Sequence, residues 1–424
     1  MLRSKVLRLV ALLLALALLV AACADDAEEV EEEPEEDPVD EEVDDDEDDE
    51  VAADGMLLGT VLPETGPLAD LGPPQIESVN LAVEDINDAG GVLGADVSTS
   101  FGDEAGDPAV ASETVERLLG EGVHGIIGAA ASGITNAITG QITGAEVVQC
   151  SGSNTAPVME GGPTGYYVRT APTDALQGIV LGEVVISDGF FDVSIMARAD
   201  DYGEGFLEVL SEAIEEQGGT VLSEVLYDPE AASFTADVEN AVADDPEAIV
   251  IIGFDEGAQV ISDLIEAGYG PDDAALYTAD GMQSSTLWED VDPDNSAVLV
   301  GMRGTAPGGA EDYAERLLAV DGVDDPIFGA QVYDCVVLLA LAAEAAGSVD
   351  PSVYQAELRN VSQDGEVCTS FAECRDLLAD GADIDYQGPS GNVEWDDVGD
   401  ITTAEYVIFE FDEDGVPAEV DRVN

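Results

Sequence analysis

Small hydroxyl residues follow two apolar segments in the first half of the chain. Ser132 comes shortly after the apolar run that ends at Gly128 and just before a helix that we expect to start near Ile134. Residues 151–155, Ser-Gly-Ser-Asn-Thr, hold the same place after the next apolar run. Open α/β sheets bind ligands at the carboxyl ends of their strands, and the first N–H groups of a helix favour an anion. The sequence therefore predicts a carboxylate-binding position here, unless Ser132 serves only as a helix cap.

The usual catalytic motifs are missing from the sequence. Gly120, Gly122 and Gly125 match the spacing of a dinucleotide-binding turn, but they lie after a helix and before a strand, the reverse of the required order. The chain has neither a Gly-x-Ser-x-Gly elbow nor a phosphate-binding Gly-Lys-Ser loop. With one His, and with no Lys after residue 5, few general bases are available. We predict a binding protein with no catalytic residue and no cofactor, although the many carboxylates leave a hydrolase formally open.

The sequence predicts no metal site. Asp290, Asp292 and Asp294 imitate the start of an EF-hand, but the loop lacks the turn glycine at its sixth position and the bidentate acid at its twelfth. The cysteines after residue 23 do not have the spacing of a zinc site.

These four cysteines suit an oxidising compartment. Cys368 and Cys374 enclose a short loop, and we expect them to pair. Cys150 and Cys335 form a second disulfide or remain two buried thiols.

The N-terminal residues indicate export. Three basic residues precede an apolar run at 9–20, which is too short for a membrane span, and small residues lead directly into Cys23. This pattern resembles the bacterial lipobox. It predicts a signal peptide over residues 1–22 and a lipid on Cys23, with an ordinary secretory signal as the alternative.

The charge of the chain is strongly negative. Residues 24–54 contain 21 acids among 31 residues, so we interpret 23–54 as the lipidated cysteine and a disordered acidic tether. The remaining 370 residues hold 73 acids against eight Arg, which excludes nucleic acid as a partner. The excess of negative charge also makes the folded chain repel itself. Salt shortens the Debye length and weakens this repulsion, so we interpret the composition as adaptation to a saline environment.

Apolar runs alternate with amphipathic stretches in two successive series, which predicts parallel sheets covered by helices. Residues 90–128 and 218–253 repeat the same order: Gly-Gly, a strand, an Asp-Pro turn, a helix, and a strand ending Ile-Ile-Gly. The expected strands are 56–62, 97–101, 124–128, 146–149, 192–196, 220–226, 248–252 and 275–278, with two more in 391–411. The expected helices are 75–89, 108–119, 134–143, 178–188, 205–216, 234–243, 258–267 and 331–346.

Seven motifs in order resemble the branched-chain amino-acid binding family of type I periplasmic binding proteins. They lie at 59–69, 84–94, 107–108, 126–128, 166–170, 201–205 and 384–391. The resemblance implies two doubly wound α/β lobes joined by a three-stranded hinge, with a ligand in the cleft between them. Residues 55–174 and 305–347 would form the N-terminal lobe, and residues 175–304 and 348–424 the C-terminal lobe.

The resemblance also implies roles for residues of the N-terminal lobe. Ser132 and Thr155 would hold the α-carboxylate of an amino acid. The carbonyl of Ser153 and the hydroxyl of Thr155 would accept from its ammonium group.

Three residues of the C-terminal lobe would complete the site. Tyr202 would close over the ligand, and Phe254 would pack near it unless it belongs to the core. Asp280 would supply the anion for the ammonium group. A member of the family has Glu at this position, and because Asp is one methylene shorter, a repositioned ammonium contact or a different ligand stays open.

The implied protein is an extracytoplasmic, lipid-anchored and monomeric binder of a branched-chain or other small amino acid, which works with an ABC permease. Binders of urea, short amides or aromatic acids with the same fold stay open as alternatives. So does a ligand-sensing receptor domain.

Overall fold

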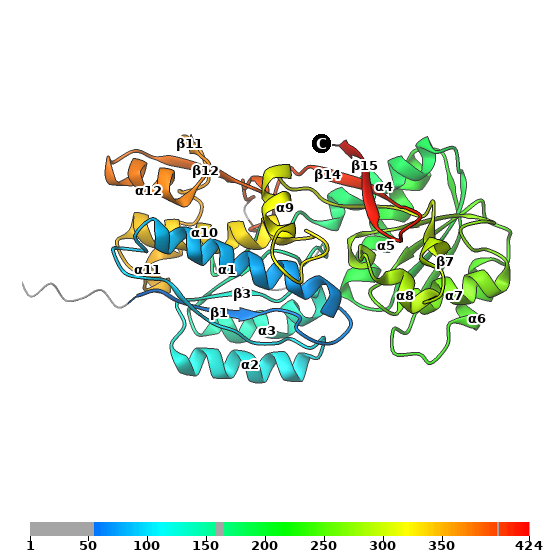
Figure 1. The fold of residues 1–424 in the computed structure, drawn as a ribbon, viewed down its shortest axis with the longest axis horizontal. Coiled ribbons are helices and arrows are strands. Elements are labelled where there is room, and N and C mark those ends of the chain that lie inside the picture. The colour runs from blue at the N-terminus through cyan, green and yellow to red at the C-terminus, as the bar shows by residue number, and fades with distance from the viewer. Residues whose placement is uncertain (1–54, 158–164, 397, 424) are drawn as a thin grey trace, which may run out of the picture. The chain divides into compact units, whose positions relative to one another are not determined.

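The computed structural model describes residues 55–157, 165–396 and 398–423. The predicted signal peptide (1–22), Cys23 and the acidic tether (23–54) lie outside the described residues. The described chain is an α/β protein with two parallel-sheet lobes, as predicted (Figure 1).

The first lobe has a five-stranded parallel sheet in the order β2-β1-β3-β4-β5. Its helices lie in two layers: α2 packs on α3, and α1 packs on α10 on the other face (Figure 1). Its strands are β1 (Leu57–Val61), β2 (Ser98–Ser100), β3 (Gly125–Gly128), β4 (Val148–Ser151) and β5 (Tyr167–Arg169). Its main helices are α1 (Gly72–Asp88), α2 (Pro108–Glu121), α3 (Ser132–Gly144) and α10 (Gly329–Ala346), with the 3₁₀ turn η1 (Ala69–Leu71) before α1.

The second lobe has a seven-stranded sheet in the order β15-β14-β10-β9-β8-β6-β7, in which β14 is antiparallel to both of its neighbours. Its strands are β6 (Asp192–Arg198), β7 (Thr220–Tyr227), β8 (Ala248–Ile252), β9 (Ala275–Thr278), β10 (Arg303–Pro307), β14 (Tyr406–Phe411) and β15 (Pro417–Val423). Its helices are α4 (Asp174–Ser187), α5 (Asp201–Glu216), α6 (Thr235–Ala241), α7 (Gly257–Ala267) and α8 (Leu287–Val291), with η3 (Asp280–Met282) and η4 (Ser296–Leu299).

Local sequence accounts for the central elements. Strand β8 is the continuous apolar run Ala-Ile-Val-Ile-Ile, and all five of its residues are buried, as expected for a parallel strand covered on both faces. Helix α2 begins after Asp107, whose carboxylate accepts from the N–H of Ala109 at 2.7 Å, and Pro108 is its first residue. Gly122 ends this helix in a left-handed conformation, Gly120 lies in its last turn and Gly125 begins β3, so the three glycines run from a helix to a strand, as predicted.

The chain passes between the lobes three times. It leaves the first lobe between β5 and α4, returns after β10, and leaves again between β13 (Gly391–Asn392) and β14. Crossings at three places agree with the expected hinge.

The predicted lobe boundaries differ from the structure after residue 347. Helices α11 (Pro351–Tyr354) and α12 (Phe371–Ala379) contact α10, and the sheet β11-β12-β13 lies beside them. Tyr354, Phe371 and Tyr386 share a buried core with Met56 of the first lobe. Residues 351–393 therefore belong to the first lobe. Strand β10 (Arg303–Pro307), of which the prediction placed residues 305–307 in the first lobe, belongs to the sheet of the second lobe. The remaining elements here are α9 (Glu311–Leu318), β11 (Glu366–Cys368) and β12 (Ile384–Gly388).

Both cysteine pairs are disulfide-bonded in the structure. Cys150 of β4 is joined to Cys335 of α10, and Cys368 is joined to Cys374 across the β11–α12 turn. Among the described residues only α10 is long and apolar enough to span a bilayer, and 83% of it is buried within the protein, as in a core helix.

Candidate functional site

All six predicted ligand residues line one cavity between the lobes. The cavity measures about 20 Å³, room for about one water molecule, so an amino acid enters only if the lobes separate or side chains move. Its lining comprises Leu68, Leu71, Gln75, Ala130, Ala131, Ser132, Ser153, Thr155, Tyr202, Phe254, Asp280, Gly281 and Phe328. Larger hollows of about 480 and 700 Å³ lie elsewhere, and neither contains any of the six residues.

The predicted ligand residues lie in segments that directly follow parallel strands. Ser132 begins α3 after β3, and Thr155 follows β4. Phe254 follows β8, and Asp280 follows β9 in the second lobe. Every one of them therefore lies beyond the carboxyl end of a strand, where open α/β sheets bind ligands.

Ser132 does not cap its own helix, so that alternative is wrong. The N-cap of α3 is Ala131, which has no capping side chain, and the Ser132 hydroxyl accepts from the N–H groups of Thr155 (3.3 Å) and Ala156 (3.2 Å). Two accepted bonds use both lone pairs of the hydroxyl oxygen and leave its proton to donate. The first N–H groups of α3 also lack partners within the helix. This end of the cavity suits a carboxylate.

Glu104, which the sequence analysis missed, supports the loop that precedes Ser132. Its carboxylate is fully buried and accepts from the N–H groups of Ala130 (2.7 Å) and Ala131 (3.3 Å). Burial raises the pKa of Glu104 to about 8, although these two bonds act in the opposite direction. Glu104 thereby fixes the backbone beside the candidate carboxylate position.

Asp280 presents a buried carboxylate from the second lobe. Its Oδ1 atom accepts from the Tyr202 hydroxyl at 2.7 Å, and its Oδ2 atom has no hydrogen-bond partner among the described residues. Burial raises the pKa of Asp280 to about 6, against the lowering effect of the bond from Tyr202. A cationic group of a ligand would meet this carboxylate.

An aromatic wall stands beside Asp280. The rings of Tyr202 and Phe254 stack at 5.3 Å with 18° between their planes, and the guanidinium carbon of Arg198 lies 3.6 Å from the centre of the Phe254 ring. Arg198 in turn pairs with Asp200 (2.6 Å) and Glu256 (2.9 Å). Phe254 is thus part of the cavity wall and not only of the core, and Arg198 is a further residue that the sequence analysis missed.

Ser153 and Gln75 join the loop after β4 to helix α1. The Ser153 hydroxyl donates to Gln75 Oε1 at 2.7 Å, and Gln75 Nε2 donates to the carbonyl of Leu71. The side chain of Ser153 therefore serves the scaffold, and its carbonyl is the group that the prediction assigns to the ligand.

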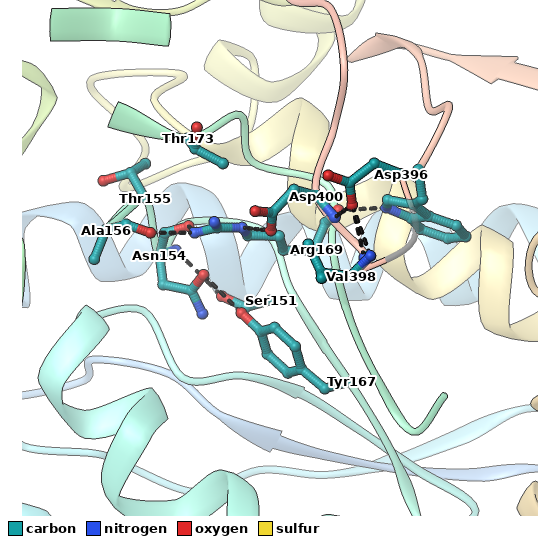
Figure 2. A network of polar contacts seen from close by, with 12 residues as sticks. Ser151, Asn154, Thr155, Ala156, Tyr167, Arg169, Thr173, Asp396, Val398 and Asp400 are labelled. Carbon is teal, nitrogen blue, oxygen red and sulfur yellow. Dashed lines mark hydrogen bonds and ion pairs between the residues drawn. The ribbon is translucent and has the colours of Figure 1, made fainter. Parts of the chain in front are cut away.

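Arg169 ties this loop to the crossing segments (Figure 2). Its side chain is fully buried; Nε lies 2.7 Å from Asp400 Oδ1, and Nη1 donates to the carbonyl of Ala156 at 2.9 Å. Trp395, on the same crossing segment as Asp400, donates to the carbonyl of Arg169 at 2.6 Å. The guanidinium group of Arg169, at the start of the β5–α4 crossing, therefore contacts both the β13–β14 crossing and the loop that carries Thr155.

Polar contacts hold the two lobes together next to the cavity. Asp70 of the first lobe accepts from the hydroxyls of Ser284 (3.0 Å) and Thr286 (2.7 Å) of the second. Asn136 donates to Asp201 at 2.8 Å across the same boundary. The two lobes are therefore in direct contact around the small cavity.

Comparisons with known proteins agree with this architecture. The sequence pattern of the periplasmic binding protein family matches residues 57–379. The chain is 27% identical to the chemotactic signal transduction system substrate-binding protein BasB of Halobacterium salinarum, over 81% of this chain and 84% of the relative. It is 25% identical to the leucine-, isoleucine-, valine-, threonine- and alanine-binding protein of Pseudomonas aeruginosa, over 87% and 93%.

Two solved structures show the same fold. The branched-chain amino acid transporter substrate-binding protein LivJ of Streptococcus pneumoniae, in complex with isoleucine, superposes with a TM-score of 0.71 at 20% identity, over 87% of this chain and all of that one. A solute-binding protein of an ABC transporter from R. palustris, in complex with 4-hydroxybenzoate, gives 0.69 at 18% identity, over 87% and 97%.

Proposed function

Because the chain belongs to the periplasmic binding protein family, we propose that it captures a branched-chain or other small amino acid between its lobes and delivers it to an ABC importer. It binds its solute and does not transform it. The family match and the amino-acid-binding relative from Pseudomonas aeruginosa support this assignment.

The observation that carries the proposal is the division of polar groups between the lobes. The first lobe contributes the Ser132 hydroxyl and the start of α3, which favour a carboxylate. The second lobe contributes Asp280, which favours a cation. A zwitterionic amino acid satisfies both, whereas a ligand with only one of the two charges satisfies one.

Closure on the ligand follows from this division. The ligand enters while the lobes are apart, contacts the first lobe, and bridges to Tyr202 and Asp280 when they approach. Only contacts that exist in the closed form shift the equilibrium towards it, so second-lobe residues govern closure. The permease then recognises the closed form.

A thermal-shift panel tests the proposal. The purified protein in about 1 M NaCl is screened against the amino acids, urea, short amides and aromatic acids. A ligand at 100 times its Kd adds about 2.7 kcal/mol to the free energy of unfolding, which is readily measured. Stabilisation by leucine, isoleucine or valine supports the proposal. Stabilisation only by urea, an amide or an aromatic acid contradicts the proposed ligand class.

Sensing is the second candidate function, because BasB is a substrate-binding protein of a chemotactic system. Deletion of the gene separates the two roles. Loss of uptake of the labelled ligand indicates transport, and loss of chemotaxis with normal uptake indicates sensing.

The export and anchoring of the chain are part of the proposal. A lipid on Cys23 would hold the protein at the outer face of the cell membrane, with the acidic residues 24–54 as the spacer. Replacement of Cys23 by Ser is expected to release the protein from membranes into the medium or periplasm. Retention of the C23S protein in the membrane fraction would contradict this anchor.

A further inference from the structure

Two carboxylates of the first lobe hold a short segment of the second lobe. The segment is Ser284-Ser285-Thr286, which lies between η3 and α8. Oδ2 of Asp70 accepts from the hydroxyls of Ser284 (3.0 Å) and Thr286 (2.7 Å). Oδ2 of Asp325 accepts from the N–H of Ser285 at 2.8 Å. We call these five residues the interlobe latch.

The second-lobe part of the latch is a preformed turn. The hydroxyl oxygens of Ser284 and Thr286 lie 2.8 Å apart, and the N–H of Thr286 donates to the Ser284 hydroxyl at 3.2 Å. Nε1 of Trp288 donates to the carbonyl of Ser285 at 3.1 Å. These bonds present two hydroxyls and one N–H to the first lobe together, so little ordering is needed when the turn meets the carboxylates.

The latch lies on the same segments as the cavity wall. Asp70 directly precedes the lining residue Leu71, and Asp325 lies three residues before the lining residue Phe328. The turn follows η3, which begins at the lining residue Asp280. A separation of the lobes that breaks the latch therefore also moves the wall of the cavity, so the latch and the ligand contacts form and break together.

The charge of the two lobes explains why the latch uses neutral donors. Residues 174–310 and 398–424, the second lobe, hold 38 acids against three Arg, and the rest of the chain after residue 54 holds 35 against five. Closure brings these two anionic bodies together against their mutual repulsion. Hydroxyl and N–H groups bind a carboxylate without a cation, and hydrogen bonds to a charged acceptor are stronger than neutral ones.

We propose that Asp70 and Asp325 are positioning residues that hold the lobes closed through the turn 284–286 and thereby set how long the ligand stays bound. This inference rests on the proposed function and adds residues outside the lining of the cavity. When the lobes are apart, water solvates every group of the latch, so its bonds stabilise the closed form alone. Loss of a latch bond therefore accelerates release of the ligand and leaves its first encounter with the open form unchanged.

Stopped-flow fluorescence tests the latch, with leucine as the probe and Trp288, bonded to the turn, as a reporter. Leucine association and release are measured on the full protein in about 1 M NaCl. Asp70→Ala and Asp325→Ala are each expected to raise the release rate at least about fivefold and to leave the association rate within about twofold of the wild type. The separate contact between Asn136 and Asp201 remains in both variants, so closure is weakened and not abolished.

A double-mutant cycle tests whether Asp70 acts through the turn. Thr286→Val removes the hydroxyl and keeps the branched side chain, and we expect it to raise the release rate by itself. Combined with Asp70→Ala it is expected to add nothing, because the acceptor of that hydroxyl is already gone. Effects that multiply in the double variant would show that the two residues act separately, and would overturn the latch.

Asp350→Ala is the matched control. Asp350, like Asp70, is an exposed acid that accepts from a hydroxyl, that of Ser352 at 2.7 Å, but both residues belong to the first lobe. This variant is expected to bind and release leucine as the wild type does.

The outcomes separate this inference from the proposed function. Wild-type release rates in Asp70→Ala and Asp325→Ala overturn the latch and leave the proposed function intact, because leucine still binds. A change confined to the association rate also overturns the latch, since it places these residues in the first encounter. Failure of leucine and every other amino acid to bind the wild type overturns both proposals.

Discussion

The hydroxyl of Tyr202 donates to Oδ1 of Asp280 across 2.7 Å, and this bond joins the aromatic wall of the cavity to its candidate ammonium-binding carboxylate. It orients the carboxylate from one side and leaves Oδ2 without a partner among the described residues. Oδ2 of Asp280 can therefore accept a hydrogen bond from a donor group of a ligand.

Asp280→Ala is expected to weaken amino-acid binding at least about tenfold, or about 1.4 kcal/mol, because the ammonium group loses its anion in the second lobe. Calorimetric titration with leucine measures this directly. Asp263→Asn serves as the control, since Asp263 is a mostly buried acid of the same lobe that accepts from the N–H of Phe234 away from the cavity. Equal affinities for wild type and Asp280→Ala would contradict the assignment.

Ser132→Ala is expected to reduce both affinity and stability. The ligand carboxylate loses a hydroxyl donor, and the N–H groups of Thr155 and Ala156 lose the oxygen that accepts from them. Buried unsatisfied donors cost about 1–3 kcal/mol, which urea unfolding would measure. Ser112→Ala, on α2, removes a hydroxyl that donates to Oε1 of Gln141 and should change neither affinity nor the site. Wild-type stability in Ser132→Ala would show that the two N–H groups find other acceptors.

Glu104 makes stability depend on pH. Its ordinary pKa of 4.5 rises to about 8 in the folded protein, so the folded state favours the protonated form. The stabilisation from the protonated Glu104 is complete below the pKa that this group has in the unfolded chain. It is lost as the pH rises through the pKa that the group has in the folded protein. Between pH 6 and 9 the wild type should lose about 2 kcal/mol more than Glu104→Gln in urea unfolding. Glu116→Gln, an exposed change on α2, should behave as the wild type; a wild-type pH profile in Glu104→Gln would refute the assignment.

The two disulfides are expected to contribute unequally. Their cysteines are separated by 185 residues for Cys150–Cys335 and by 6 for Cys368–Cys374. Loop-closure entropy then predicts losses of about 5 and about 2 kcal/mol when each is removed, as upper values. Urea unfolding of the two double Cys→Ala variants compares them, and a larger loss for the short loop would contradict this ranking.

Salt is expected to stabilise the protein. The chain after residue 54 holds 73 acids against eight Arg, and the Debye length falls from about 10 Å at 0.1 M to about 3 Å at 1 M salt. The melting temperature should rise by at least about 5 °C between these conditions, equivalent to about 4 kcal/mol at an unfolding entropy of about 2.1 cal/mol/K per residue. Sucrose at equal osmolality tests whether screening is the cause, because it stabilises without screening charge. An equal effect of sucrose would contradict the electrostatic explanation.

Much of the fold could be predicted from local sequence. Strand β8 is an uninterrupted apolar run, and α2 carries its cap in Asp107 and Pro108, so both were found within a few residues. Strands β5 and β11 have three residues each, and such segments exist only through their partners in the sheet. Periodicity has too few residues there to indicate them.

Some residues of the candidate site could likewise be predicted from local sequence, and others could not. Hydroxyl residues after β3 and β4 could be predicted as site residues, because strand ends and helix starts meet at one edge of a parallel sheet. Glu104 could not, since it is one of 94 acids and nothing near it in the sequence separates a buried carboxylate from an exposed one. Arg198 belongs to the site only because Phe254, 56 residues later, places its ring against the guanidinium group.

By itself, the sequence determined the α/β class and the two series of strands and helices, because these follow from the short-range spacing of apolar and polar residues. Its motifs carried the family resemblance, and that resemblance implied six of the residues that line the cavity. The tertiary structure decided that residues 351–393 belong to the first lobe, that Cys150 pairs with Cys335, and that the buried Glu104 bonds the loop before Ser132. Contacts of this kind join residues far apart in the chain, and only the packing of the whole protein selects which of many acids, cysteines and short strands meet.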